Sequence, residues 1–261
     1  MINKYVDDGK PFDWGKTSLD YAKYRDIYPQ EMYDKILSWG LCTKGQNILD
    51  LGTGTGVLPR NMYQYGGKFI GVDISENQIE QARILSSEQG LDIDYYVSSV
   101  EQLDFSENAF DVITAFTCFF YFDHEKLLPI VKKILKPNGH ILVGYMAWLP
   151  FEDKIAEESE KLILKYNPNW SGAGETRRLV ELSEVYKKDF DIVHNEHFDV
   201  KIPFTIDTWN GRMKACRGVG ASLSQDKIRE FEKEHLKMLN EFGNTNVDIL
   251  HNIALLDIQL K

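Results

Sequence analysis

The feature that most constrains this chain is a regular alternation of apolar strands and amphipathic helices between residues 30 and 146. Five short apolar runs are separated by helical periodicity, at residues 47–51, 68–73, 93–97, 110–116 and 140–146. Strands that are apolar on both faces are typical of a parallel sheet covered by helices on both sides. We therefore predict a doubly wound α/β sheet, whose ligands bind beyond the carboxyl ends of the strands.

The alternation stops after residue 146, and the remaining segments are interpreted as a cap and the end of the same sheet. Helices are expected over residues 151–166, about 179–188, and from a Ser224 cap onward. Two further strands are expected at residues 191–202 and 248–260. We predict one domain, with a core at about 30–146 plus the last two strands. Cap insertions are expected at about 147–190 and 203–245, and residues 1–29 are expected to form a lid.

Composition excludes several classes of function. The formal net charge of −10 repels phosphate backbones, so no nucleic-acid partner is expected. The three cysteines are far apart and the six histidines share no ligand spacing, so we expect reduced thiols and no metal site. The first residues contain no long apolar stretch, which predicts neither a signal peptide nor a membrane anchor, and a cytoplasmic protein.

A glycine-rich turn follows the first strand, in the sequence DLGTGTG from Asp50 to Gly56. Glycines allow a tight turn and a close approach of the backbone to a ligand. A dinucleotide fingerprint would need its third glycine at Val57, and a phosphate loop would need a Lys-Ser/Thr pair. The turn therefore favours a ligand without a pyrophosphate, and a tight loop that binds nothing stays open as the alternative.

An acidic residue ends the second strand, 23 residues after Asp50. This residue, Asp73, can accept hydrogen bonds from both hydroxyls of a ribose. The alternative is a helix cap, because acids favour helix N-termini. Ser75 fits the cap better, since Gln78 stands three residues later, as in a capping box.

These motifs together resemble the class I S-adenosylmethionine-dependent methyltransferases. The resemblance rests on ILDLGTGTG, then GVDIS, FDVITA and LKPNGHIL, and covers about residues 20–146. It is greatest to the small-molecule branch that includes enzymes of ubiquinone and menaquinone biosynthesis. The segment YAKYRDIYP is similar to a YxxYRPxYP segment of some members, with Asp26 in place of the first proline. The resemblance implies a Rossmann-like sheet of seven strands with an antiparallel last strand.

The resemblance also implies the cofactor S-adenosylmethionine, the product S-adenosylhomocysteine, and a set of cofactor contacts. The turn would bind the methionine moiety, Asp73 the ribose, and Ile74 the adenine ring. The family usually has an acidic residue where Ser99 stands, so the contact with the adenine amino group is weaker here. Arg25 would match the cofactor carboxylate, or form a surface ion pair instead. The cofactor-binding candidates are Tyr24, Arg25, Asp50, Gly52, Thr53, Gly54, Asp73, Ile74, Gln78, Ser99, Val100, Ala115 and Phe116.

The methyl acceptor is expected to be a small molecule that the sequence does not identify. Methyl transfer is an in-line displacement that positioning alone accelerates strongly, so no catalytic residue is assigned. An aromatic wall would suit a planar or cationic acceptor, although each of its members can equally be a core residue. The acceptor candidates are Phe119, Tyr121, Trp148, Trp170, Trp209 and Arg212.

Two other classes of function stay open at this point. One is a protein or RNA methyltransferase, and the other is a nucleotide-dependent oxidoreductase or binding module. The oxidoreductase is disfavoured by the missing third glycine of the dinucleotide fingerprint. The chain is expected to act as a monomer or a homodimer, without a membrane partner.

Overall fold

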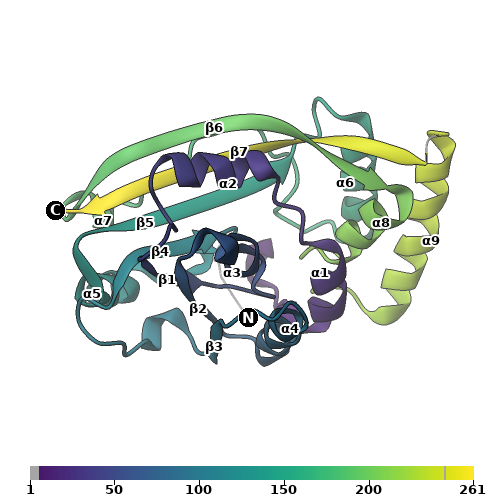
Figure 1. Ribbon diagram of the computed structural model, residues 1–261. Helices are drawn as coiled ribbons and strands as arrows, with labels where there is room; N and C mark the ends of the chain where they lie inside the picture. Colours follow the sequence, from purple (N-terminus) through teal and green to yellow (C-terminus); the bar gives the residue numbers. More distant parts are fainter. Residues whose placement is uncertain (1–5, 244) are drawn as a thin grey trace. The chain divides into compact units, whose positions relative to one another are not determined.

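The computed structural model describes residues 6–243 and 245–261, and its central feature is a seven-stranded sheet (Figure 1). The strand order is β3-β2-β1-β4-β5-β7-β6, in which the first five strands pair in parallel and β7 is antiparallel. This confirms the predicted doubly wound sheet with an antiparallel last strand. The strands are β1 (Asn47–Leu51), β2 (Lys68–Asp73), β3 (Asp94–Val97), β4 (Phe110–Phe116), β5 (Leu135–Trp148), β6 (Phe190–Thr205) and β7 (Asn246–Leu260).

The chain divides into two compact units. The first, here called the sheet unit, contains residues 28–146, 178–198 and 253–261. The second, here called the helix unit, contains residues 6–27, 147–177, 199–243 and 245–252. Strands β5, β6 and β7 contribute residues to both units. The predicted lid begins with residues 1–5, which lie outside the described part of the chain.

The sheet unit is built on a core of fully buried strand residues such as Leu49, Ile113 and Ile141. Its strands alternate with short helices, as the apolar periodicity predicted. Figure 1 shows the C-terminus beside α7, where the Lys261 amide donates to the Asp189 carbonyl. The helices of this unit are α2 (Gln30–Ser38), α3 (Val57–Met62), η3 (Tyr63–Tyr65), α4 (Glu76–Glu88), η4 (Val100–Gln102), η5 (Phe119–Tyr121), α5 (His124–Ile134) and α7 (Glu184–Lys187).

Two predicted helices of the sheet unit have different bounds in the structure. The apolar spacing of Leu127, Leu128, Val131 and Leu135 predicts a helix that Pro137 and Gly139 end, whereas α5 ends at Ile134. Leu135 is instead the first residue of β5 and pairs with Phe110. The helix expected over about 179–188 is a single turn, α7. The residues before it form no helix, and their apolar side chains Val180 and Leu182 pack against the sheet core.

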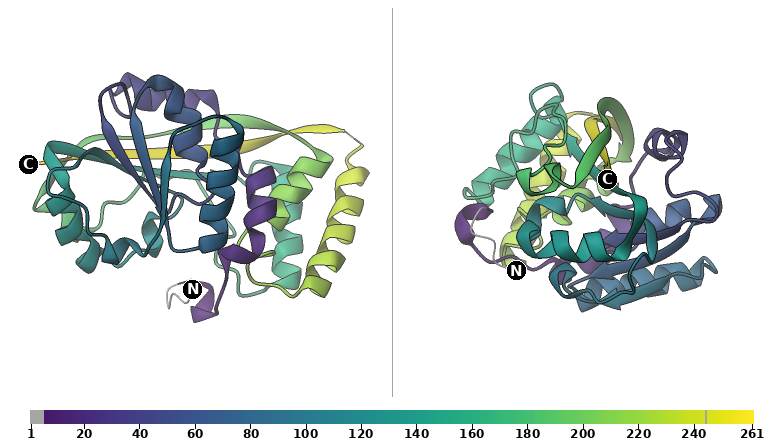
Figure 2. Two further views of the ribbon diagram at one scale, coloured as in Figure 1. Left: turned by 60° about the horizontal axis from the view of Figure 1, so that its bottom comes forward. Right: turned by 90° about the vertical axis from the view of Figure 1, so that its left-hand side faces the viewer.

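The helix unit contains a group of three packed helices, α6 (Lys154–Tyr166), α8 (Ile206–Lys214) and α9 (Gln225–Glu241). They lie side by side in Figure 2. Buried His235 of α9 joins all three, with Nε2 at 3.0 Å from Ser159 Oγ and Nδ1 at 2.9 Å from Asn210 Oδ1. Ser224 caps α9 as predicted, because its hydroxyl accepts from the Lys227 amide. The other helices of the unit are η1 (Asp7–Gly9), η2 (Trp14–Thr17) and α1 (Ser18–Tyr24).

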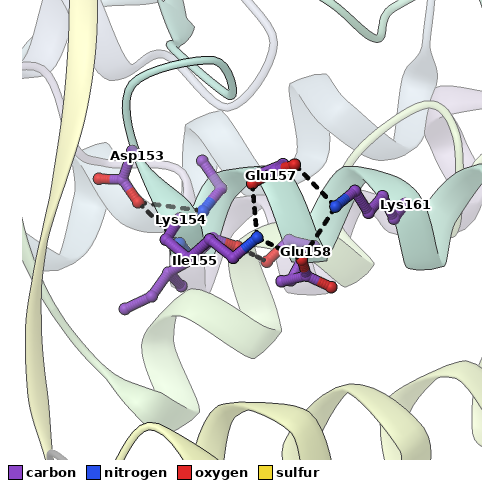
Figure 3. A network of polar contacts seen from close by, with 8 residues as sticks. Asp153, Lys154, Ile155, Glu157, Glu158 and Lys161 are labelled. Carbon is purple, nitrogen blue, oxygen red and sulfur yellow. Dashed lines mark hydrogen bonds and ion pairs between the residues drawn. The ribbon is translucent and has the colours of Figure 1, made fainter.

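Helix α6 begins at Asp153, whose carboxylate accepts from the amides of Ile155 and Ala156 (Figure 3). Such a cap satisfies amides that have no partner within the helix. On the exposed face of the same helix, Lys154 and Lys161 each form ion pairs of 2.7–3.0 Å with Glu157 and Glu158. Ion pairs of this kind add little stability each, so the cap and the buried face define the helix.

Candidate functional site

The glycine-rich turn closes β1 with backbone angles that only glycine adopts easily. Gly52 and Gly54 have φ values of 61° and 56°. A Cβ atom on Gly52 would come within 2.8 Å of Cys118 Sγ, so a side chain would also collide with the segment after β4. The Thr53 amide donates to the Val72 carbonyl at 2.9 Å, which ties the turn to β2. The turn is therefore a fixed part of the sheet edge.

Asp50 lies beneath this turn and is 3% exposed. Its carboxylate accepts a 2.6 Å hydrogen bond from the Thr114 hydroxyl of β4. Burial raises the pKa of Asp50 to about 7, although the hydrogen bond from Thr114 opposes the rise and the charge of Asp73 adds to it. A cationic ligand group nearby would favour the ionised form of Asp50. The site thus fits the ammonium group of a methionine moiety.

Asp73 ends β2 and connects the turn to the start of α4. Its Oδ2 accepts from the Gly54 amide at 3.0 Å, and its Oδ1 accepts from the Ser75 amide at 2.8 Å. Burial raises its pKa, and the hydrogen bonds from backbone amides oppose this rise. Each carboxylate oxygen has a second lone pair, so both can still accept from ribose hydroxyls. Ser75 is the helix cap, as predicted, since its hydroxyl accepts from the Gln78 amide.

The residues expected around an adenine ring surround the same sheet edge. Ile74 directly follows Asp73 and is 59% exposed, so its apolar side chain is accessible to a ligand ring. Val100 and Gln78 are buried. The Ser99 hydroxyl donates to Glu101 Oε2, and the Asp123 amide donates to Glu101 Oε1 at 3.0 Å. Burial alone would raise the pKa of Glu101, but these hydrogen bonds lower it.

The end of β4 contains a strained residue that sequence reasoning missed. Thr117 has a φ of 56°, which is an outlier for a β-branched residue. Its hydroxyl lies 3.1 Å from Tyr28 Oη, and the Tyr28 ring packs edge-on against Phe116 at 5.8 Å. Cys118 then donates to the Leu51 carbonyl at 3.1 Å. Ala115 and Phe116, two of the cofactor-binding candidates, are the last two residues of β4, directly before these contacts. No sequence signal marks a threonine that will adopt this backbone conformation.

Several acceptor candidates come together in the helix unit. The Trp148 indole contacts Trp170 and Trp209, with ring centroids 6.2 and 5.8 Å apart. The Arg212 guanidinium stacks on Trp148 at 5.0 Å. Two indole N–H groups are already used, because Trp148 donates to Glu160 at 2.6 Å and Trp209 donates to Ser159 at 3.0 Å. Trp209 is fully buried, so its observed contacts are those of a core residue.

The other candidates have separate surroundings. Phe119 packs in the core of the sheet unit against Tyr186 and His124, and Tyr121 follows it in η5. In the helix unit, Tyr24 packs against Gly211, and the Arg25 guanidinium lies 4.5 Å from the Tyr21 ring centroid. The contact of Arg25 with the cofactor carboxylate stays a prediction.

The described residues form neither a metal-binding cluster nor a membrane-spanning helix. Among residues 6–243 and 245–261, no group of three or more histidine, cysteine or acidic side chains is arranged to hold a metal ion. Within the same described residues, every helix is too short or too polar to cross a membrane.

Comparison with protein families matches residues 42–205 to a methyltransferase domain, which is more than half of the chain. This chain belongs to the class I S-adenosylmethionine-dependent methyltransferases. Its cofactor class is therefore S-adenosylmethionine. Membership of this family decides against the nucleotide-dependent oxidoreductase that the sequence left open.

Relatives of this methyltransferase include ubiquinone biosynthesis O-methyltransferases. The protein from Hahella chejuensis is 26% identical over 66% of this chain and 71% of its own length. The protein from Nitrosococcus oceani is 33% identical over 52% of this chain and 58% of its own length. The matched segment thus spans between about half and three quarters of these two relatives.

Solved structures share the fold. A type II methyltransferase from Anaeromyxobacter dehalogenans, described as putative in its structure report, superposes with a TM-score of 0.57 at 16% identity. The match covers 90% of this chain and 97% of that chain. Identity at this level supports the fold alone.

Proposed function

We propose that this methyltransferase transfers the methyl group of S-adenosylmethionine to a small molecule, with the cofactor bound at the Gly52–Gly54 turn. The observation that carries the site assignment is the arrangement of Asp50 and Asp73 around that turn. Asp73 accepts from the Gly54 amide, and Asp50 is buried beneath it. One acidic group is thus available for an ammonium and one for a ribose.

The cofactor supplies a methyl group on a positively charged sulfur. When bound, it would give that methyl group to the acceptor and leave as S-adenosylhomocysteine, and an acceptor that reacts through oxygen or nitrogen would release a proton. The residues of this chain bind and orient the reactants, which can supply up to about 7–11 kcal/mol of the barrier in favourable cases. In this proposal Asp73 holds the ribose, Ile74 packs on the adenine, and Asp50 faces the ammonium.

The acceptor is proposed to be a small molecule on the strength of the family resemblance and the charge of the chain. The net charge of −10 disfavours RNA. The relatives named above are O-methyltransferases of ubiquinone biosynthesis, and they indicate acceptors of modest size. A screen of candidate acceptors, with S-adenosylhomocysteine formation as the readout, also tests a protein or RNA acceptor.

Calorimetric titration of the ligand-stripped protein with S-adenosylhomocysteine tests the cofactor site. We expect saturable binding of one ligand per chain. Asp73→Ala should weaken binding by about 1–3 kcal/mol, because a charge-assisted hydrogen bond to the ribose is lost. Asp92→Ala, which removes an exposed acid elsewhere in the sheet unit, should bind like the parent. No binding to the parent at millimolar ligand would refute the site, and equal binding by Asp73→Ala would remove the role of Asp73.

A further inference from the structure

His251 is a fully buried histidine of the helix unit with one nitrogen that is not satisfied. It lies on β7 and its exposed fraction is 0%. Its Nδ1 is 2.9 Å from the Ile249 carbonyl oxygen. Because a carbonyl can only accept, Nδ1 carries the proton, and in a neutral imidazole Nε2 is then a bare acceptor. Among the described residues, no donor reaches this buried Nε2.

The surroundings keep this imidazole neutral. Burial lowers the pKa of His251 to about 3, and the positive charges of Arg212 and Arg25 lower it further against the hydrogen bond to Ile249. The rings of Phe204 and Trp209 flank the imidazole, with centroids 6.1 and 6.2 Å away. A buried acceptor without a donor is costly, which makes it a candidate for recognising a ligand.

Two arginines bring positive charge to the same part of the helix unit. Arg212 is 3% exposed, and its guanidinium stacks on Trp148, whose ring lies against Trp209. Arg25 follows Tyr24, whose ring packs against Gly211, the neighbour of Arg212 in the sequence. Both arginines also act on the buried Cys216 thiol. Burial raises the pKa of this thiol, and the positive charges of the two arginines oppose part of the rise. This part of the helix unit therefore contains two guanidinium cations, of Arg212 and Arg25, and one nitrogen, His251 Nε2, that can accept a hydrogen bond.

We propose that Arg212, Arg25 and His251 Nε2 recognise an acceptor that carries an anionic group beside a hydroxyl group. The anion pairs with the guanidinium groups, which match carboxylate and phosphate by parallel hydrogen bonds. The hydroxyl donates its hydrogen to Nε2. This assignment replaces the planar or cationic acceptor suggested by the aromatic residues, because the cluster is itself cationic. It also gives Arg25 to the acceptor instead of the cofactor carboxylate. It rests on the proposed function, since it names the class of acceptor.

The experiment measures the binding of four small probes to the parent protein by calorimetry at neutral pH. The probes are 2-hydroxybenzoate, benzoate, phenyl phosphate and 2-hydroxybenzamide. We expect 2-hydroxybenzoate to bind about tenfold or more tightly than the uncharged amide, and more tightly than benzoate, which lacks the hydroxyl. Comparing the affinity for benzoate with that for phenyl phosphate shows whether the anionic group is a carboxylate or a phosphate. Equal binding of all four probes, or no binding at millimolar concentration, would overturn the inference.

Two substitutions test the roles of the arginine and the histidine separately. Arg212→Gln should remove the preference for the charged probe, and His251→Phe should remove the preference for the hydroxyl while benzoate still binds. His235→Phe is the matched control, because His235 is also a buried histidine of this unit but has both nitrogens hydrogen-bonded. This control should keep both preferences. Loss of the hydroxyl preference in His235→Phe as well would mean that the effect is structural.

Nuclear magnetic resonance of the imidazole nitrogens in the parent protein does not depend on any variant folding. We expect His251 to be the neutral form with its proton on Nδ1, and its Nε2 signal to shift when 2-hydroxybenzoate is added. An unchanged signal at saturating probe would refute the contact. Titration with S-adenosylhomocysteine runs in parallel. If S-adenosylhomocysteine binds and the probes do not, only the inference about the acceptor is rejected. If the probes bind and S-adenosylhomocysteine does not, the proposed cofactor site is rejected.

Discussion

At the scale of single residues, the candidate cofactor site depends on a buried acid whose pKa is unusual. Asp50 has almost no contact with solvent and a pKa of about 7, because burial outweighs the hydrogen bond from Thr114. In the unfolded chain an aspartate has a pKa near 3.9. The folded state therefore holds its proton over a pH range in which the unfolded state has lost it.

This difference predicts a pH-dependent cost to stability. Between about pH 4 and pH 7 the folded state binds more protons than the unfolded state, so the contribution of Asp50 to stability falls as the pH rises. Asp50→Asn keeps the shape and can still accept from Thr114, but it cannot ionise. Its melting temperature should rise relative to the parent from pH 4 to pH 7 and then level off, as calorimetry at several pH values would show. A difference that stays constant with pH would contradict this account.

At the scale of secondary-structure elements, a single glycine decides how closely two helices of the helix unit approach. Gly211 lies in α8, and a Cβ atom built on it would come within 2.5 Å of the Tyr24 ring of α1. Distances below about 3 Å are not tolerated between such atoms, so a side chain there would push Tyr24 away.

We predict that Gly211→Ala destabilises the protein by about 1–3 kcal/mol through overpacking, despite the higher helix propensity of alanine. Chemical denaturation measures the change. Combining it with Tyr24→Ala should recover part of the loss, because the smaller residue makes room for the new methyl group. Strictly additive effects of the two substitutions would show that the ring and the glycine do not interact.

At the scale of the whole molecule, the open question is whether the segments outside the core respond to the cofactor. The sequence predicted a lid formed by Tyr21–Pro29 with the cap segments. Loops and insertions placed on a rigid sheet are often the parts that carry specificity. Closing a lid would exclude water and strengthen electrostatic contacts with the cofactor.

Hydrogen exchange with and without S-adenosylhomocysteine tests this prediction. A lid requires ligand-dependent protection in Tyr21–Pro29 and in at least one of the segments 147–190 and 203–245. Protection of the amides in Asp50–Gly56 and Asp73–Gln78 is expected from ligand binding itself and serves as the internal control. If protection is confined to those two segments, the cap is a rigid part of the fold and the lid is rejected.

The sequence by itself determined the first half of the sheet. The bounds of β1, β2 and β4 were predicted to the residue, because each is a short, continuously apolar run between turn signals. The glycine-rich turn and Asp73 were predictable for the same local reason, since a turn and a strand end depend on neighbouring residues. The helix caps at Ser75, Asp123 and Ser224 also follow from local hydrogen bonding.

Only the tertiary structure decided the features that depend on distant partners. Leu135 leaves α5 for β5 because it pairs with Phe110, and β6 and β7 extend beyond their predicted ends. The strained backbone of Thr117 and its contact with Tyr28 join residues 89 positions apart. The sequence pattern predicts only that His251 is one residue of an apolar strand. Its Nε2 has no donor among the described residues, because packing buries the imidazole among segments that local sequence patterns do not connect.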